Sequence, residues 1–301
     1  MQQHQTSFLT STIKLKNNVR LKAYLMTKGI LVFAYNNADI DYVKQAAFLA
    51  GRSKEYLNLP VSIVTDEKSI GDRYKGWFDK IIISDIITAS SKKKYYNGAE
   101  QSTVLEFKND KRPFAYDLSP YDETLMLDSD YVIADDVLKN CFTSAYDFLI
   151  YKDAIDLAGN RETNEFKVIS ETSIDFYWAT CVFFRKSQLN EIFFNLIKHV
   201  QEFYTHYRKV YNIVTTTYRN DFAFSIAIHI INGFKKGDFA KRMPGKLFFT
   251  ADRDLLHSID GNQFIFLLQS TGSLDKYSPC KFQGNSVHVM NKYTLEDNLN
   301  A

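Results

Sequence analysis

The sequence predicts an α/β protein with a mainly parallel central sheet, helices on both faces of that sheet and an elaborated C-terminal half. Two observations lead to this prediction. Apolar runs such as GILVFAY at residues 29–35 are short and nearly continuous, which is typical of strands buried on both faces. An amphipathic stretch follows this first run and further apolar runs come next, and that strand–helix–strand order indicates an open parallel sheet.

The first half of the chain provides most of this pattern. Between the first two expected strands, apolar residues recur at helical spacing, and they are Ile40, Val43, Ala47 and Ala50. The expected strands are residues 29–35, 61–64, 78–83 and 125–127. Polar residues follow these strands at the sheet edge where ligands bind in such folds. Residues 86–115 lack a clear pattern, and we expect them to be irregular.

The second half is expected to add helices and later strands. An apolar run at residues 179–184 predicts a strand, and an amphipathic helix follows it. The residues expected on the buried face of that helix are Leu189, Ile192, Phe193, Leu196, Ile197, Val200 and Phe203. Asp221 opens a second, apolar helix over residues 222–231. Late strands are expected at residues 247–249, 264–268 and 287–290.

Composition narrows the setting of the protein. The net charge of +2 is too small to indicate a polyanionic partner by itself. Short basic runs such as the lysines at 92–94 are expected to lie in solvated loops. The three cysteines form no close pair in the sequence, which argues against a disulfide framework or a zinc site and favours a reducing, cytoplasmic setting. No apolar stretch is long enough to span a bilayer, so an integral membrane protein is not expected.

Asp128 and Asp130 are the residues that point most clearly to chemistry. They stand one residue apart, directly behind the apolar run at residues 125–127. Side chains at such spacing point the same way along a strand, so both carboxylates can reach one ion. Carboxylates suit Mg²⁺ or Mn²⁺, which are often shared with substrate phosphates. A simple turn is the alternative, because Asp and Ser are common in turns, but the preceding strands favour a metal site.

The segment RPFAYDLSPYDETLMLDSD at residues 112–130 resembles the metal-site region of GT-A glycosyltransferases. It is most similar to family 8, in which a basic residue and a short helix precede a strand ending in D-x-D. The runs at residues 29–37 and 62–66 resemble the nucleotide-binding half of that family. The resemblance implies a GT-A fold in which Asp128 and Asp130 bind Mn²⁺ (or Mg²⁺). That ion would bridge the two phosphates of a nucleotide-diphosphate sugar and offset their growing charge.

A second resemblance lies in NSVHVMNK at residues 285–292. In the family, a late histidine often completes the metal shell and a nearby lysine contacts the diphosphate. The resemblance therefore implies that His288 is a third metal ligand and that Lys292 binds the diphosphate. A structural role for His288 is the alternative, because a single histidine is more often structural than a ligand.

The resemblance also suggests roles for residues at the strand ends. Tyr35 and Asn36 would lie near the base and ribose, Asp66 would contact the base or ribose, and Arg112 would face phosphate. Asp221 is the expected catalytic carboxylate, because the family places an acidic residue at the start of a comparable helix, beside the sugar, where it binds sugar hydroxyls or the acceptor, or acts as general base in inverting enzymes. The alternative is that Asp221 or its neighbour only caps that helix.

These observations predict a metal-dependent glycosyltransferase with a nucleotide-sugar donor. Residues 1–27 would form an N-terminal extension and residues 28–301 one GT-A-like domain, with a nucleotide-binding half at 28–136 and an acceptor-side half at 137–301. The acceptor stays open between a glycan, a protein and a hydroxymethylated base in phage DNA, the last of which would place the enzyme in the host cytoplasm. A nucleotidyltransferase and a non-catalytic nucleotide- or carbohydrate-binding module are the alternatives. No P-loop or G-x-G-x-x-G is present, which disfavours nucleotide hydrolysis and dinucleotide redox chemistry.

Overall fold

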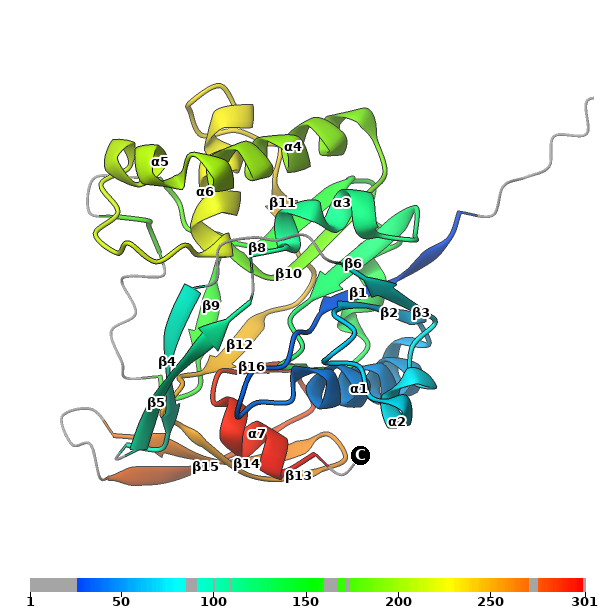
Figure 1. Ribbon diagram of the computed structural model, residues 1–301, viewed down its shortest axis with the longest axis vertical. Helices are drawn as coiled ribbons and strands as arrows, with labels where there is room; N and C mark the ends of the chain where they lie inside the picture. The colour runs from blue at the N-terminus through cyan, green and yellow to red at the C-terminus, as the bar shows by residue number, and fades with distance from the viewer. Residues whose placement is uncertain are drawn as a thin grey trace, which may run out of the picture.

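A seven-stranded sheet lies at the centre of the protein, with the strand order β11-β8-β10-β6-β1-β2-β3 (Figure 1). The computed structural model describes residues 26–84, 91–99, 101–108, 110–159, 167–170, 174–270 and 276–299. The strands of the central sheet are β1 (Lys28–Phe33), β2 (Val61–Thr65), β3 (Lys80–Ile83), β6 (Glu123–Leu127), β8 (Phe148–Tyr151), β10 (Trp178–Arg185) and β11 (Lys241–Arg242).

The sheet is mixed but mainly parallel, which confirms the predicted fold class. Strand β1 runs parallel to both β2 and β6, β2 runs parallel to β3, and β8 runs parallel to β11. Strand β10 is antiparallel to β6 and to β8. Because β1 and β6 are parallel neighbours buried on both faces, their carboxyl ends meet at one edge of the sheet, where a ligand site is expected.

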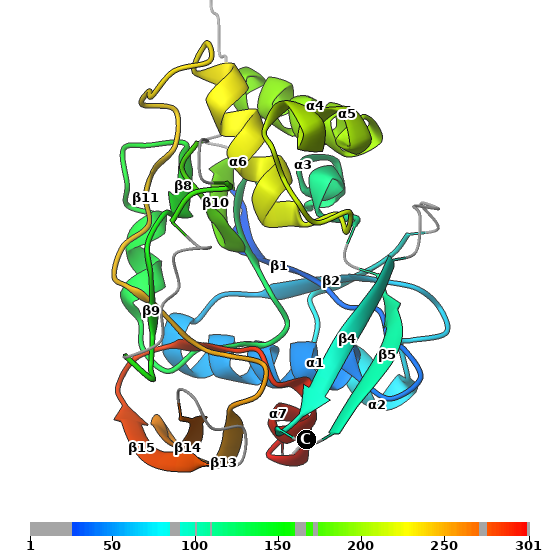
Figure 2. The same cartoon turned by 90° about the vertical axis from the view of Figure 1, so that its left-hand side faces the viewer.

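Helices cover both faces of the sheet (Figure 2). One face carries α1 (Tyr42–Arg52) and α2 (Asp72–Lys75). The opposite face carries α3 (Ala115–Leu118), α4 (Gln188–Glu202), α5 (Tyr204–Val210) and α6 (Asn220–Ile231). Helix α6 is apolar on nearly every side and is buried between α4 and β10, as its eight buried residues indicate.

Two smaller sheets lie beside the central one. The first has the order β7-β16-β12-β9, and its strands are β7 (Tyr131–Val132), β9 (Ala154–Asp156), β12 (Leu247–Thr250) and β16 (Val287–Val289). The second consists of β13 (Leu255–Asp260), β14 (Gln263–Gln269) and β15 (Tyr277–Gln283). Strand β16 pairs antiparallel with β7, directly after Asp130, and α7 (Lys292–Asp297) follows it. This pairing brings the C-terminal residues to the end of β6.

The prediction that residues 86–115 are irregular is wrong. Strands β4 (Ser91–Asn97) and β5 (Gln101–Phe107) form an antiparallel hairpin there, and a short 3₁₀ helix (Arg112–Phe114) follows. The hairpin is mostly polar, so it lacks the apolar alternation by which strands are recognised. It nevertheless buries Tyr95 and Leu105, one from each strand, against the rest of the molecule. Asp85 and residues 86–90, 100 and 109 lie outside the described residues.

The predicted N-terminal extension lies almost entirely outside the described residues. Of the proposed N-terminal extension at residues 1–27, only the last two residues are described. The remaining short helices are a π-helical turn at Ser53–Leu57 and a 3₁₀ helix at Val137–Cys141. Among the described helices, none has both the length and the apolar character needed to cross a membrane.

Candidate functional site

The turn Asp128-Ser129-Asp130 is held between strands of two different sheets. Its backbone forms a tight turn, in which Tyr131 N donates to Asp128 O at 3.1 Å. Asp128 N donates to Thr180 O of β10 at 3.0 Å, and Val289 N of β16 donates to Asp130 O at 3.0 Å. The turn and the metal-site interpretations of this tripeptide are therefore compatible, because the turn directs both carboxylates to the same place.

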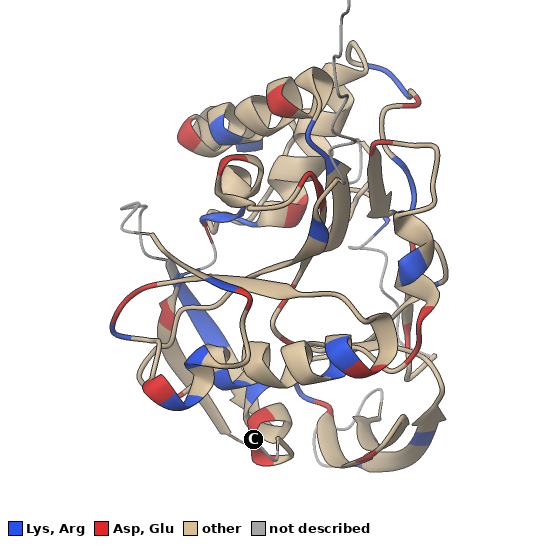
Figure 3. Cartoon of the chain, turned by 90° about the vertical axis from the view of Figure 1, so that its right-hand side faces the viewer, with Lys and Arg blue, Asp and Glu red and all other residues tan. Residues whose placement is uncertain are grey.

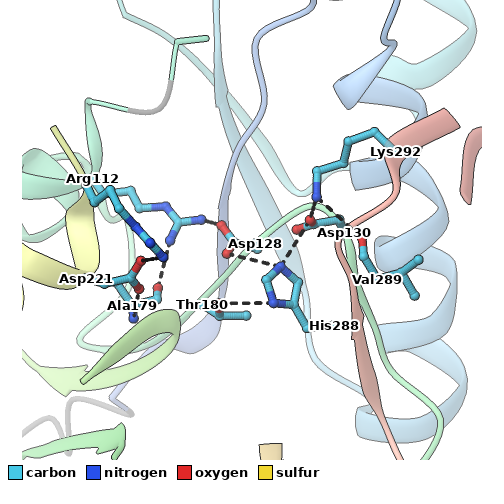
Figure 4. Close-up of polar contacts among 10 residues, drawn as sticks. Arg112, Asp128, Asp130, Ala179, Thr180, Asp221, His288, Val289 and Lys292 are labelled. Atoms are coloured by element: carbon cyan, nitrogen blue, oxygen red, sulfur yellow. Dashed lines mark hydrogen bonds and ion pairs between the residues drawn. The ribbon is translucent and has the colours of Figure 1, made fainter. Parts of the chain in front are cut away.

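Asp128, Asp130 and His288 form a compact group that could hold a metal ion (Figure 4). One ligand atom from each lies within 4.8 Å of the other two. His288 Nε2 is 3.1 Å from Asp130 Oδ2 and 3.9 Å from Asp128 Oδ2. Burial lowers the pKa of His288 to about 3, so the imidazole is neutral near pH 7 and has a lone pair available for a metal. Thr180 Oγ1 lies 3.5 Å from Nδ1 on the other side of the ring.

Each aspartate of this group has a buried cation beside it. Arg112 forms an ion pair with Asp128 and also donates from a terminal nitrogen to Ala179 O at 2.7 Å. Lys292 forms an ion pair with Asp130. Burial lowers the pKa of Arg112 to about 10 and that of Lys292 well below its ordinary value. The carboxylates and cations together make a nearly balanced charge cluster shielded from water, where electrostatic interactions are strong.

Lys292 is placed by the start of a helix. Asn291 caps α7, because its side-chain oxygen accepts a hydrogen bond from Thr294 N at 3.1 Å. Lys292 is therefore the first residue of the helix, immediately after β16 has brought the chain past Asp130. The four-residue separation of His288 and Lys292 thus spans a strand end and a helix start.

Asp221 does not cap α6, so the alternative that it serves only as a helix cap is wrong. The helix begins after Arg219 and has no side-chain cap. Instead, Asp221 Oδ1 accepts a hydrogen bond from Ala179 N of β10 at 2.9 Å, and Oδ2 accepts one from Arg219 at 3.1 Å. Figure 4 shows the carboxylate beside β10, on the side of the site away from Lys292. Asp221 is thus held in a fixed orientation by contacts outside its own helix.

These residues line one cleft of about 570 Å³. The N-terminal half contributes aromatic side chains to it, namely Phe33, Tyr35, Tyr42 and Phe107. The C-terminal half contributes the aromatic side chains of Trp178, Tyr218 and Phe249, together with polar groups. The cleft also includes seven of the predicted site residues, which are Tyr35, Arg112, Asp128, Asp130, Asp221, His288 and Lys292. A cleft of this size is typical of a small-molecule site, and this one combines aromatic side chains with many polar and charged groups.

Two predicted residues do not line this cleft, Asn36 and Asp66. Asn36 holds the start of α1, because its side-chain oxygen accepts from Val43 N at 3.0 Å and its amide donates to Asp41 at 2.9 Å. Asp66 accepts a hydrogen bond from Ser69 N at 2.8 Å. Both side chains therefore stabilise turns near the carboxyl ends of β1 and β2.

Six charged residues of the cleft were not among the predicted site residues, and they are Lys93, Lys108, Asp110, Asp156, Arg219 and Asp252. Asp252 comes shortly after β12, so the same rule that selected Asp128 could have found it. Burial raises the pKa of Asp252 above its usual range. Lys93 stands in the segment that was expected to be irregular, and only the pairing of β4 with β5 reveals which way it faces.

No family model matches the sequence, and no curated protein matches it. The solved structures to which the chain is similar include three glycosyltransferases. GlyE of Streptococcus pneumoniae TIGR4 is 13% identical with a TM-score of 0.40, over 72% of this chain and 45% of GlyE. The galactosyltransferase LgtC, in complex with donor and acceptor sugar analogues, is 14% identical with a TM-score of 0.41, over 65% of this chain and 70% of LgtC.

The third is the bifunctional glycosyltransferase WbbM, 15% identical with a TM-score of 0.36, over 59% of this chain and 35% of WbbM. The chain spans less than half of the GlyE and WbbM chains. None of the three is described as a phage protein or as acting on DNA.

Proposed function

We propose that this protein is a metal-dependent glycosyltransferase that uses a nucleotide-diphosphate sugar as its donor. The observation that supports this most strongly is the group of Asp128, Asp130 and His288 within a cleft that also holds Arg112 and Lys292. Acidic ligands and cations side by side are what a metal-bound diphosphate requires, because the carboxylates hold the ion and the cations hold the phosphate oxygens.

The residues present fit Mn²⁺. Two carboxylates and a neutral imidazole form a mixed oxygen and nitrogen donor set, and imidazole favours Mn²⁺ over Mg²⁺, which takes mainly oxygen ligands. When bound, such an ion offsets the negative charge that grows on the diphosphate as the bond to the sugar breaks. Arg112 and Lys292 add positive charge at the same place, and their burial makes that charge more effective.

Asp221 is proposed to act on the sugar side of the cleft. Its carboxylate is held by Ala179 N and Arg219, so its orientation does not depend on substrate. In an inverting reaction, the acceptor hydroxyl attacks the anomeric carbon, the bond from that carbon to the phosphate oxygen breaks, and Asp221 takes the hydroxyl proton. In a retaining reaction, Asp221 would bind sugar hydroxyls. Tyr35 is proposed to lie beside the nucleotide on the opposite side.

The acceptor is proposed to be a hydroxyl-bearing molecule: a glycan, a protein or a modified base in DNA. A DNA acceptor would require basic residues gathered over its phosphates. On the face shown in Figure 3, lysines and arginines alternate with aspartates and glutamates. This mixed charge does not favour DNA over the other acceptors. What the residues of the cleft support is the donor, a nucleotide-diphosphate sugar, and the reaction type, transfer of its sugar.

Turnover of a donor panel tests this proposal. The purified protein is incubated with ADP-, CDP-, GDP- and UDP-sugars and Mn²⁺, and the released nucleoside diphosphate is measured, since transferases commonly hydrolyse their donor slowly without an acceptor. Release from one donor that stops on chelation of the metal and in Asp128→Asn is the expected result. Release from none of the donors, in a protein that is folded and monodisperse, would reject the proposal.

A further inference from the structure

The lysines at residues 92–94 do not form a single basic surface. They lie on β4, where successive side chains point to opposite faces. Lys92 and Lys94 are exposed, whereas Lys93 is half-buried and lines the cleft. Lys93 pairs across the hairpin with the buried Leu105. The hairpin therefore inserts the middle lysine into the cleft and leaves its two neighbours in water.

The ammonium group of Lys93 is packed against aromatic rings. Its Nζ lies 5.2 Å from the ring centre of Phe107 and 5.6 Å from that of Tyr95. Such contacts favour a cation but are weaker than an ion pair. Tyr95 is itself fixed, because its hydroxyl bonds to the Tyr42 hydroxyl at 2.9 Å in a buried position. Lys93 is therefore held at the cleft by an anchored hairpin.

Lys93 differs from the other cations of the cleft in its pairing. The others each have a carboxylate partner, and these ion pairs are Lys108–Asp66, Arg112–Asp128, Arg219–Asp221 and Lys292–Asp130. Within the part of the chain that the structure describes, Lys93 forms no hydrogen bond or ion pair. Asp252 and Asp221 influence it only through space, and burial lowers its pKa. A half-buried cation without a partner is unfavourable unless an anion binds beside it.

The position of Lys93 indicates which anion would bind. Lys93 lines the same cleft as Asp128, Asp130 and His288. Lys93 and the candidate metal group therefore face the same space. An anion held by that group would be within reach of Lys93.

We infer that Lys93 binds the diphosphate of the donor, so that the β4–β5 hairpin supplies a third cation beside Arg112 and Lys292. This inference rests on the proposed function. The diphosphate, which is the leaving group, would then be contacted from three separate elements: the segment before β6, the start of α7 and the hairpin. It also explains why a lysine occupies a position next to Tyr95, Leu105 and Phe107.

The test compares three variants by calorimetric titration. Lys93→Met removes the charge and keeps the apolar stem, Lys93→Arg keeps the charge, and Lys94→Met is the matched control on the exposed face of the same strand. The probes are Mn²⁺ alone, Mn²⁺ with inorganic pyrophosphate, and Mn²⁺ with each of ADP, CDP, GDP and UDP. Thermal unfolding of each variant first establishes that it is folded.

The inference predicts that Lys93→Met weakens pyrophosphate and nucleoside diphosphate binding about tenfold or more, the usual effect of losing a hydrogen bond to a charged group. Binding of Mn²⁺ alone does not weaken, Lys93→Arg retains most of the affinity, and Lys94→Met behaves as wild type. If Lys93→Met matches Lys94→Met, the inference is overturned while the proposed function stands. The same holds if the affinity for a nucleoside diphosphate falls and that for pyrophosphate does not. If the wild type binds no diphosphate with Mn²⁺, the proposed function fails and the inference with it.

Discussion

At the scale of single residues, His288 is unusual because its ionisable ring is buried next to two carboxylates. Its side chain is almost fully buried, and its pKa is lowered to about 3. In the unfolded chain, an ordinary histidine has a pKa of about 6.5. Between these two values the unfolded state binds more protons than the folded one, so the free energy of unfolding rises with pH in that window.

Stability should therefore fall as the pH is lowered from about 6.5 towards 3, and His288 should contribute up to about 1.4 kcal/mol per pH unit to that fall. His288→Gln removes this contribution. Urea unfolding of both proteins at a series of pH values measures it, as the pH slope of the difference between them. A difference that does not change with pH would show that His288 is not buried in its neutral form.

Asp221 provides a prediction about activity. Asp221→Asn keeps an oxygen that can accept from Ala179 N, so the fold should be unaffected. Loss of a general base typically lowers kcat by about 10²–10⁴-fold, and we expect a decrease in that range if the reaction inverts the anomeric carbon. Steady-state kinetics with the matched donor measure kcat and KM separately. Asp238→Asn, at an exposed carboxylate, is the control. Unchanged kcat would exclude a base role for Asp221.

The local sequence pattern was sufficient to single out the two aspartates of the candidate metal group, but not the cations around them. Asp128 and Asp130 follow a buried strand, a local pattern that needs no knowledge of distant contacts. Arg112, His288 and Lys292 were identified only through a family resemblance, and the structure brings all of them together. Lys93 could not be identified, because its direction depends on how β4 pairs with β5.

At the scale of elements, apolar strands were predictable and polar ones were not. The expected strands at residues 29–35, 61–64, 125–127 and 179–184 correspond to β1, β2, β6 and β10, with small shifts at their ends. The β4–β5 hairpin was missed because its sequences, SKKKYYN and QSTVLEF, are dominated by polar residues. Strands of this kind are stabilised by cross-strand pairing, which depends on two segments at once.

Helix α4 shows a second limit of prediction from the sequence, which concerns the residues that face the core. Its existence was predicted, but Leu189, Ile192 and Phe203 are about half exposed rather than on the buried face. Phe193 and Phe194, which are adjacent, are both fully buried instead. Their rings pack against Phe148 and Phe184 respectively, at centroid distances of 4.7 Å. Which residues of an amphipathic stretch face the core therefore depends on the aromatic partners available.

The hairpin should depend on its buried hydroxyl contact. Tyr95→Phe removes one partner of the Tyr42–Tyr95 hydrogen bond and leaves the other buried, which should cost about 1–3 kcal/mol in free energy of unfolding. Urea unfolding measures this cost. Tyr96→Phe, on the opposite face of the same strand, should change stability much less. Equal effects of the two substitutions would contradict the anchoring role of Tyr95.

At the scale of the whole molecule, the site exists because distant segments of the chain meet. Strand β16 pairs with β7, so that Asp130 and His288 come into contact although they are 158 residues apart. The α/β class followed from the order of apolar runs, whereas this long-range pairing has no local signal. Removal of the segment after residue 286 should therefore abolish metal binding as well as destabilise the smaller core around β16.

Asp128, Asp130 and His288 are proposed to bind a divalent metal together with a nucleoside diphosphate. A thermal-shift panel of ADP, CDP, GDP and UDP, with and without Mn²⁺, on the wild type and on Asp130→Ala tests it most directly. A ligand at 100 times its Kd stabilises a fold by about 2.7 kcal/mol, which gives a readable shift. We predict that one nucleoside diphosphate raises the melting temperature only with Mn²⁺ and only in the wild type. Stabilisation that is independent of Mn²⁺, or equal in Asp130→Ala, would contradict the claim.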